Sequence, residues 1–261
     1  MAVSELRPDS SVVAEVKPSP NHGERTRAPD MIVLHYTGVP DNQEAINFLC
    51  NPDSKVSAHY VVLQDGRIVQ LVAEARRAWH AGTSSWAGET DVNSCSIGIE
   101  IANPGHDHGY PAFPKRQIAA VTALCRSILG RYRIPADRVL AHSDVAPARK
   151  QDPGEKFPWK ALADSGIGLW VKPAPIEPGG AIFALGETSP IIQEMQELLA
   201  KYGYEVAATG YLDRTTLDAF AAFQRHFRPA RVDGVIDASS LATLKALLAA
   251  RELRSKAAKP G

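Results

Sequence analysis

The sequence lacks the features that mark several large classes of protein. No apolar stretch approaches the roughly 20 residues that a membrane-spanning helix needs. Acidic and basic residues balance at 29 each, so we expect neither a nucleic-acid partner nor a membrane span. A Gly-rich phosphate loop, a serine nucleophile elbow and a Cys-x-x-Cys pair are also missing. These absences argue against nucleotide, serine-hydrolase and thiol-redox chemistry.

Cysteine is scarce, and an export signal is not evident. Cys50, Cys95 and Cys125 are odd in number and have no metal-binding or redox spacing, so we interpret them as reduced structural thiols. Residues 1–27 are polar and contain no apolar core of the secretory type. We therefore expect a disordered polar leader and a cytoplasmic protein. A periplasmic or secreted location is expected instead if a signal has been trimmed from this sequence.

The composition is that of a soluble globular protein, and its pattern predicts an α/β domain. Of the 261 residues, 44% are hydrophobic and 22% are charged, which is enough apolar material for a core. Short apolar runs alternate with segments of helical periodicity, which favours a mixed β-sheet flanked by helices. The predicted strands are 31–36, 58–63, 67–72, 96–102 and 138–142, and the predicted helices are 42–50 and 114–132.

A second, smaller unit is predicted after residues 172–180, which are rich in proline and glycine. Three stretches with helical patterns follow, and a Gly-x-x-Asp phrase recurs at Gly210 and Gly234, with each aspartate where a helix N-cap belongs. We expect a compact three-helix domain. The expected division is a domain over 28–172, a linker over 173–186, a helical domain over 187–251 and a polar tail over 252–261, with helices at 190–202, 214–227 and 238–250.

Three residues could form a metal site. His35 and His142 each end a predicted strand, and Asp152 returns from a loop, so the three side chains can converge at one edge of a sheet. Catalytic zinc takes three nitrogen or oxygen ligands from protein and keeps one position open for water. The alternatives are a histidine hydrogen-bonded in the core and, for Asp152 before Pro153-Gly154, a simple turn residue.

Two further residues could supply proton transfer and charge stabilisation. Glu100 lies opposite the isoleucines of its alternating strand, so it is either a solvent-facing glutamate or a general base beside a metal. Lys150 lies two residues before Asp152 and would project to the same side of an extended loop. There it could stabilise an oxyanion, although an ordinary exposed lysine is the alternative.

Residues with a possible role in substrate binding come from aromatic and histidine-bearing segments. His59 could face the same cleft or be a packed core residue. Trp79, His80 and Trp86 lie in a loop suited to a sugar or peptide groove, or else are packing residues. Two loop histidines, His106 and His108, could bind metal, but a solvated loop is the simpler interpretation, and we leave them out of the predicted site.

Several separated motifs together resemble one family. His35 closing an apolar strand, the segments 57–62, 78–82 and 96–101, and the segment 142–152 occur in the order typical of the amidase-2 family of N-acetylmuramoyl-L-alanine amidases, of the AmpD and AmiD type. The resemblance covers about residues 28 to 165. The second unit resembles a three-helix peptidoglycan-binding domain through its paired Gly-x-x-Asp phrases.

The resemblance implies a zinc-dependent amidase. It places the zinc ligands at His35, His142 and Asp152, the catalytic glutamate at Glu100 and the oxyanion-side lysine at Lys150. The implied cofactor is Zn²⁺, and the implied partners are peptidoglycan or muropeptide fragments, cut between the lactyl group of muramic acid and L-alanine. Combining the two domains resembles the AmiD type, whose members are exported lipoproteins, whereas no lipoprotein signal is evident here.

Two other functions remain open at this point. A non-catalytic peptidoglycan-binding protein of the same fold would normally lack a zinc ligand, and none is missing here. A phage-derived lysin or a secreted wall-remodelling enzyme would use the same chemistry in another setting. The sequence does not decide between ordinary and 1,6-anhydro-muramic acid, the stem-peptide preference or the oligomeric state.

Overall fold

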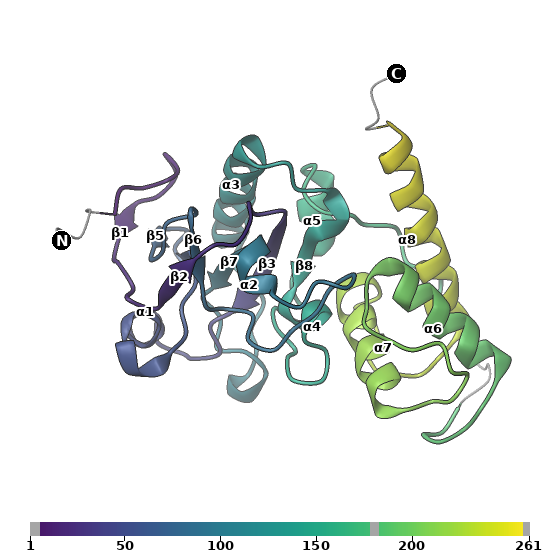
Figure 1. Cartoon of the computed structure of the whole chain (residues 1–261). Coiled ribbons are helices and arrows are strands. Elements are labelled where there is room, and N and C mark those ends of the chain that lie inside the picture. Colours follow the sequence, from purple (N-terminus) through teal and green to yellow (C-terminus); the bar gives the residue numbers. More distant parts are fainter. Residues whose placement is uncertain (1–5, 178–182, 258–261) are drawn as a thin grey trace.

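The computed structural model describes residues 6–177 and 183–257. Figure 1 shows a unit of strands and helices beside a unit of three helices, the latter in green and yellow. This is the α/β architecture with a helical second domain that the sequence predicts. The strands are β1 Glu15–Val16, β2 His22–Glu24, β3 Met31–Tyr36, β4 Tyr60–Val62, β5 Ile68–Gln70, β6 Arg76–Ala78, β7 Ser96–Ile101 and β8 Val139–Ala141.

The main sheet is mixed and has the strand order β1-β5-β4-β7-β3-β8. β3 lies between β7 and β8 and runs parallel to both. β4 runs parallel to β7 and antiparallel to β5, which confirms the hairpin predicted over residues 58–72. Since β7, β3 and β8 are neighbours with one direction, residues at their carboxyl ends meet at one edge of the sheet, where α/β proteins usually place their ligands.

Helices cover both faces of this sheet. Ile97, Ile99 and Ile101 of β7 pack in one cluster with the apolar side of α3, which leaves Gly98 and Glu100 on the opposite face. That second face carries Val61 and Val69, against which α1 packs. The helices are α1 Asn42–Cys50, η1 Pro52–Ser54, α2 Val92–Cys95, η2 His106–His108, α3 Lys115–Arg131, η3 Ala136–Arg138, α4 His142–Val145, α5 Trp159–Asp164, α6 Pro190–Tyr202, α7 Arg214–Phe227 and α8 Ala238–Ala257.

The predicted disordered leader is wrong for residues 6–27. β1 pairs in parallel with β5, and β2 pairs in antiparallel with β6. Polar side chains reinforce this backbone pairing: the Ser19 hydroxyl, for example, donates to the Leu49 carbonyl over 2.6 Å. Edge strands expose one side to water and tolerate polar sequences, so polarity alone was a poor guide. The prediction for residues 1–5 lies outside the described residues.

The three helices of the second unit begin where the sequence predicts. Asp213 caps α7 by accepting from the Thr216 amide over 2.7 Å, and Asp237 accepts from the Ser240 amide in the same way over 2.7 Å. α8 continues through residues 251–257, so the predicted polar tail is helical there. Arg251 stabilises this extension because its guanidinium donates to the Lys201 and Tyr202 carbonyls. Residues 258–261 of the predicted tail fall outside the described part.

The linker predicted over 173–186 is described only at its two ends. Ala174 is held against α8, since its amide donates to Thr243 Oγ1 over 3.0 Å and its carbonyl accepts from Ser239 Oγ over 2.7 Å. Residues 178–182 are not among those described. The domain limits drawn from the sequence remain predictions.

The two units share a buried aromatic interface. Trp86, which the sequence analysis placed in a substrate groove or among packing residues, is 2% exposed. Its ring packs edge-on against Tyr202 and Tyr204 of the helical unit, with centroid separations of 5.6 and 5.0 Å. Gly203 has φ +144° and allows this approach, because a Cβ there would lie 2.6 Å from the Trp86 ring. Trp86 therefore joins the domains and does not line a groove.

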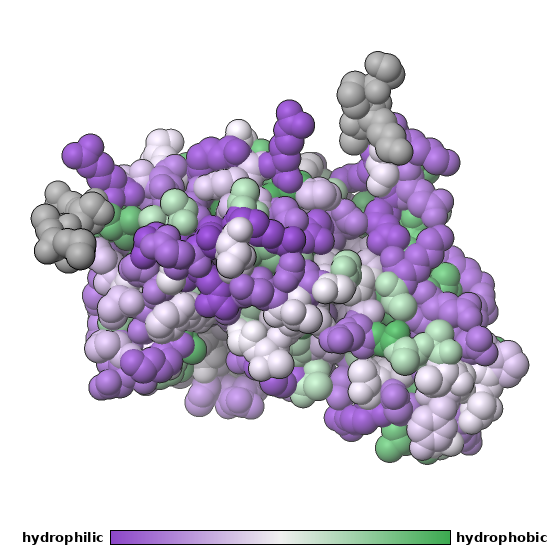
Figure 2. All heavy atoms as spheres, viewed as in Figure 1, coloured by the Kyte–Doolittle hydropathy of each residue, from purple (hydrophilic) through white to green (hydrophobic). Residues whose placement is uncertain are grey.

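The surface seen in Figure 2 is mainly hydrophilic, with small and separate hydrophobic areas. Among residues 6–177 and 183–257, none of the helices combines the length and the apolar character that crossing a bilayer requires.

Candidate metal centre

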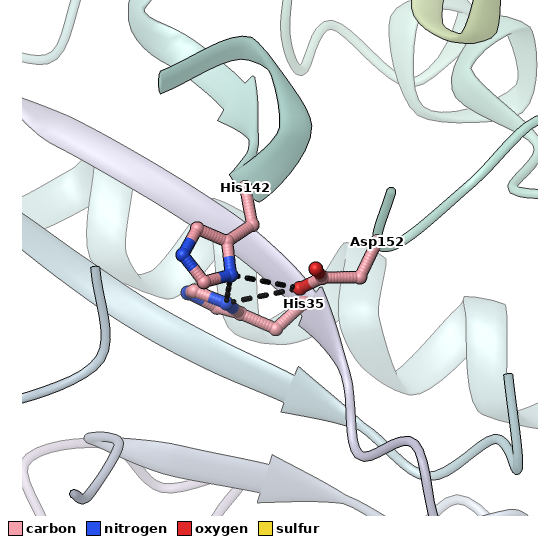
Figure 3. Close-up of side chains that lie close together, drawn as sticks. All are labelled: His35, His142 and Asp152. Atoms are coloured by element: carbon pink, nitrogen blue, oxygen red, sulfur yellow. Dashed lines mark hydrogen bonds and ion pairs between the residues drawn. The ribbon is translucent and has the colours of Figure 1, made fainter. Parts of the chain in front are cut away.

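Three of the residues predicted as ligands meet at the carboxyl edge of the sheet (Figure 3). His35 lies near the end of β3, His142 follows β8 as the first residue of α4, and Asp152 comes from the next loop. The Nδ1 atoms of the two histidines are 2.9 Å apart. Asp152 Oδ2 is 3.2 Å from His35 Nδ1 and 3.0 Å from His142 Nδ1. The three atoms thus form a small, nearly regular triangle.

The cluster is buried, and its surroundings favour a neutral His35. Burial, followed by the neighbouring His142, lowers the pKa of His35 to about 4. For Asp152, burial acts to raise the pKa, but the His142 and His35 rings outweigh it and lower the pKa below its usual range. The site at neutral pH therefore combines a neutral His35 imidazole with an ionised carboxylate.

His142 has an outer hydrogen-bond partner that suits a proton on Nε2. His142 Nε2 lies 3.2 Å from the Ala81 carbonyl oxygen, which can only accept a hydrogen bond. When the ring proton is on Nε2, the Nδ1 lone pair is free to bind a cation and points at the other two atoms of the triangle. Without a cation, the Asp152 carboxylate 3.0 Å from Nδ1 competes for the same proton.

A chain of hydrogen bonds through His80 and Ser96 holds the outer nitrogen of His35. The Ser96 hydroxyl donates to the Val92 carbonyl over 2.5 Å, so its oxygen accepts from His80 Nε2 at 3.1 Å. His80 Nδ1 is then the acceptor for His35 Nε2, 3.0 Å away. Burial lowers the pKa of His80 well below its usual value, which keeps this ring neutral. The His35 Nδ1 lone pair is therefore also bare.

These tautomers make the triangle a fit for a metal cation. With both rings protonated at Nε2, two imidazole lone pairs and one carboxylate oxygen face one another, and a positive charge between them relieves their repulsion. Tetrahedral zinc with bonds of about 2.0–2.2 Å holds its N and O ligands roughly 3.3–3.5 Å apart, so the three atoms need to spread by only a few tenths of an ångström. Outer hydrogen bonds that fix ring orientation are usual at such sites.

Glu100 lies next to the triangle. It is the register partner of His35 across β7 and β3, so its side chain is on the same face of the sheet. Its Oε2 atom is buried and has no hydrogen-bond partner within the described residues. Burial, and next the charge of Asp152, raise the pKa of Glu100 well above its usual value, while Lys150 acts in the opposite direction. A raised pKa makes the carboxylate a stronger base.

A cleft of about 450 Å³ opens onto the triangle. Glu100, Lys150 and two of the residues predicted to bind substrate, Trp79 and His80, line it. Its other wall comes from α1, including Ala45, Phe48 and Leu49. The cleft is large enough for a sugar–peptide fragment, because ligand sites typically have volumes of roughly 300–1,000 Å³.

The substrate-binding role predicted for His59 does not agree with the structure. His59 is fully buried and is not among the residues that line the cleft. Its Nδ1 accepts from the Gly98 amide over 2.9 Å, and its Nε2 is 3.1 Å from the Arg76 carbonyl oxygen. The sequence could not reveal this, because alternation along a short strand does not say which backbone groups its polar side chains satisfy. His59 is the packed core residue that was the alternative.

His106 and His108 do not join the metal triangle. The His106 ring stacks on Tyr110 with a centroid separation of 4.2 Å, and its two nitrogens lie 3.0 Å from the Tyr36 hydroxyl and 3.1 Å from Glu155. His108 is exposed. This agrees with leaving both out of the predicted site.

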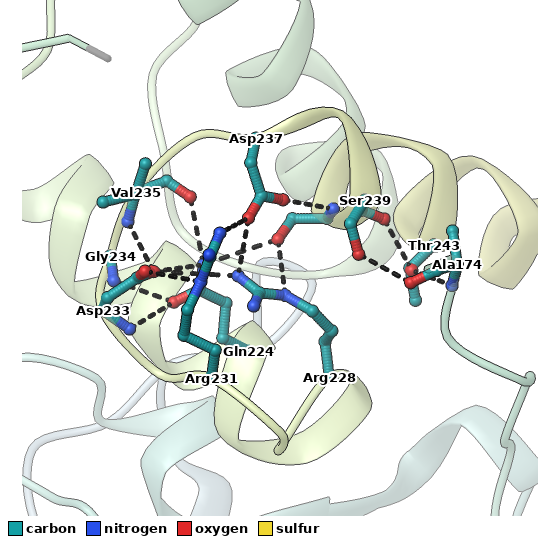
Figure 4. Close-up of polar contacts among 11 residues, drawn as sticks. Ala174, Gln224, Arg228, Arg231, Asp233, Gly234, Val235, Asp237, Ser239 and Thr243 are labelled. Carbon is teal, nitrogen blue, oxygen red and sulfur yellow. Dashed lines mark hydrogen bonds and ion pairs between the residues drawn. The ribbon is translucent and has the colours of Figure 1, made fainter. Parts of the chain in front are cut away.

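The helical domain has polar clusters of a different kind (Figure 4). The Gln224 side-chain oxygen accepts from the Gly234 amide over 2.8 Å, and its nitrogen donates to the Val235 carbonyl over 3.1 Å. Gln196 bonds Gly210 and Tyr211 in the same pattern. Two buried glutamines thus hold the two Gly-x-x-Asp phrases. The sequence analysis missed them, although each lies at a core position of a predicted helix.

The comparisons with known proteins agree with this geometry. Residues 25–155 match the family described as N-acetylmuramoyl-L-alanine amidase, and residues 188–247 match the peptidoglycan binding domain family. The chain is 39% identical to the N-acetylmuramoyl-L-alanine amidase AmiD of Escherichia coli over 233 residues, which covers 84% of this chain and 82% of that protein.

Two solved structures are similar along most of the chain. One is the complex of E. coli AmiD with anhydro-N-acetylmuramic acid-L-Ala-D-γ-Glu-L-Lys, with TM-score 0.71, 36% identity and coverage of 86% of this chain and 91% of that one. The other is AmpDH3 from Pseudomonas aeruginosa with anhydromuramic pentapeptide, with TM-score 0.69, 30% identity and coverage of 98% of both chains.

Proposed function

Because the chain belongs to the N-acetylmuramoyl-L-alanine amidase family, we propose that it hydrolyses the amide between the lactyl group of muramic acid and the L-alanine of the stem peptide. The observation that carries the proposal is the buried triangle of His35, His142 and Asp152 beside a glutamate whose buried Oε2 has no hydrogen-bond partner among the described residues. The two similar structures that hold anhydromuramyl peptides support the 1,6-anhydro form as a substrate.

We propose that His35, His142 and Asp152 hold zinc. Bound there, zinc would polarise the carbonyl of the amide and make water acidic enough to lose a proton near neutral pH. Ala81 and the chain from His80 to Ser96 keep the lone pairs of the two histidines aimed at the site. The complete ligand set speaks against the non-catalytic alternative.

Glu100 is the proposed proton carrier. Its carboxylate accepts a proton as water attacks the amide carbon, and it returns the proton to the alanine nitrogen as the C–N bond breaks. Its surroundings suit it to the first step, since burial makes the carboxylate more basic by raising its pKa. The products are the free lactyl carboxylate and the amino terminus of the peptide.

Lys150 is the proposed stabiliser of the oxyanion that develops during attack. It lines the cleft together with Glu100 and Asp152, so its ammonium can approach the carbonyl oxygen of a bound substrate. Trp79 offers an apolar ring in the same cleft for the sugar or the peptide. We also propose that the helical domain binds intact wall, as its family match suggests.

Metal analysis combined with product identification tests the proposal. The zinc-loaded protein should contain one zinc per chain and should release free stem peptide from anhydromuramyl peptides, as identified by mass. Chelation should abolish the release, and added zinc should restore it. Full activity after complete removal of zinc would overturn the proposal. Parallel digestion of intact sacculi and of soluble fragments would establish which of the two is the better substrate.

A further inference from the structure

A single buried carboxylate links the metal-bearing helix to the second domain. Asp144 is 1% exposed and lies on α4, two residues after His142. Its Oδ1 accepts from the Tyr204 hydroxyl over 2.6 Å. Its Oδ2 accepts from His226 Nδ1 over 2.6 Å and from the Ala141 amide over 2.8 Å. Two of the three donors thus come from the helical domain, after α6 and near the end of α7.

The same carboxylate sets the turn that presents His142. Ala141 is the last residue of β8 and pairs with Leu34, the residue before His35. Asp144 caps the Ala141 amide at the start of α4. It thereby stabilises the turn from strand to helix where His142 lies. The neighbouring Ser143 amide donates to the Asp152 carbonyl over 3.0 Å, which attaches the third ligand to the same turn. A shift of Asp144 would therefore move ligand atoms.

The two donors from the helical domain are themselves held in place. The His226 ring stacks on Trp159 of α5 with a centroid separation of 3.7 Å and an interplanar angle of 27°. Tyr204 packs edge-on against Trp86. Burying a charge is costly unless its bonds are all made, so the three directed bonds of Asp144 hold the carboxylate in one position between the two domains.

We propose that Tyr204 and His226 are positioning residues for the metal centre, acting through Asp144 on the turn that carries His142. The helical domain then forms part of the hydrolytic unit, in addition to any role in wall binding. This inference rests on the proposed function, since it presumes that the triangle binds a metal. It requires no change in the protonation of any group.

The tyrosines of the interface provide a matched pair of variants. Tyr204→Phe removes the hydroxyl that bonds Asp144 and keeps the ring against Trp86. Tyr202→Phe is the control, because Tyr202 is also buried, packs on the same tryptophan, and has a hydroxyl with no hydrogen bond among the described residues. His226→Phe is a second test variant that removes the donor and keeps a ring against Trp159.

The experiment measures metal binding as well as turnover, on the full chain. Zinc affinity is measured by competition with a chromophoric chelator, and ligand geometry by the visible d–d bands of the cobalt-loaded protein. We expect Tyr204→Phe and His226→Phe to weaken zinc binding about 10–100-fold, the usual effect of losing an outer partner, and to alter the cobalt bands. Values of kcat should fall while KM stays close to wild type. Tyr202→Phe should match wild type in zinc affinity, in the cobalt bands and in turnover.

Different outcomes separate the two proposals. If both test variants lose thermal stability but keep the wild-type zinc affinity and cobalt bands, the contact is structural and the positioning role is wrong. A wild-type protein that binds metal but hydrolyses nothing would refute only the proposed function, since the metal readouts still decide the positioning role. A wild-type protein that takes up neither zinc nor cobalt would overturn both.

Discussion

Asp144 and Asp152 are buried carboxylates on either side of one loop, and their surroundings are opposite in kind. Three donors face the oxygens of Asp144. Asp152 Oδ2 instead faces two imidazole nitrogens, and the outer nitrogen of each ring has a hydrogen-bond partner of its own. The charge of Asp144 is stabilised by protein donors alone, whereas the site of Asp152 needs a cation. Counting donors and acceptors therefore separates a structural carboxylate from a metal ligand, where burial alone does not.

The largest effect is expected from replacing the Asp152 carboxylate with an amide, whose nitrogen can donate hydrogen bonds to the two imidazoles. Asp152→Asn should abolish zinc uptake and hydrolysis, a greater loss than the roughly 10–100-fold that an outer partner costs. In chelator-treated protein the same change should leave stability equal or raise it, by about 0.5–1.5 kcal/mol for each hydrogen bond that the amide donates to an imidazole. Elemental analysis and calorimetry measure the two effects. A less stable metal-free variant would contradict the assigned tautomers.

Glu100→Gln should separate proton transfer from metal binding. Hydrolysis is expected to fall by about 10²–10⁴, the usual contribution of a positioned acid or base, while one zinc per chain is retained. Glu155→Gln is the matched control, because Glu155 is a half-buried glutamate paired with His106 that does not line the cleft, and its kcat should stay at the wild-type value. Equal rates for Glu100→Gln and wild type would exclude Glu100 as the proton carrier.

Asp144→Ala should destabilise the fold in addition to weakening zinc binding. Three buried donors would lose their acceptor, each at a cost of about 1–3 kcal/mol, so we expect the free energy of unfolding to fall by about 3 kcal/mol or more. Denaturant unfolding followed at two wavelengths measures it. Asp164→Ala, which removes one partner of an exposed pair with Lys160, should change it by about 1 kcal/mol or less. Similar losses for the two variants would show that the three bonds of Asp144 contribute little to stability.

Gly98→Ala should give the smallest effect of the four. A Cβ at this position would lie 2.4 Å from the His80 ring, so the ring must move and its bond to His35 must weaken. We expect a loss of about 1–3 kcal/mol in stability, together with weaker zinc binding. Gly130→Ala is the control, because a Cβ there would meet no atom of the described residues within 4 Å and alanine favours a helix. Unchanged zinc affinity in Gly98→Ala would show that the His80 chain does not orient His35.

Much of the local structure follows from sequence patterns. The apolar run at residues 31–36, the alternation at 96–101 and the helical spacing of three C-terminal segments each predict an element that the structure contains. The triangle could also be anticipated, because strand-end histidines on parallel neighbours must lie at one edge. The roles of His59 and Trp86 were harder to predict, since a buried histidine or tryptophan looks the same in sequence whether it lines a cleft, fills a core or joins two domains.

By itself, the sequence determined the longer elements, the identities of the five residues proposed for chemistry and the presence of two kinds of domain. Hydrophobic periodicity and capping residues are local properties, and they can be recognised without knowing what packs against them. Only the tertiary structure decided which partners the outer histidine nitrogens have, that Asp144 is bonded by Tyr204 and His226, and that β1 pairs with β5 and β2 with β6. These depend on hydrogen bonds between residues far apart in the chain, and such partners are set by the folded geometry.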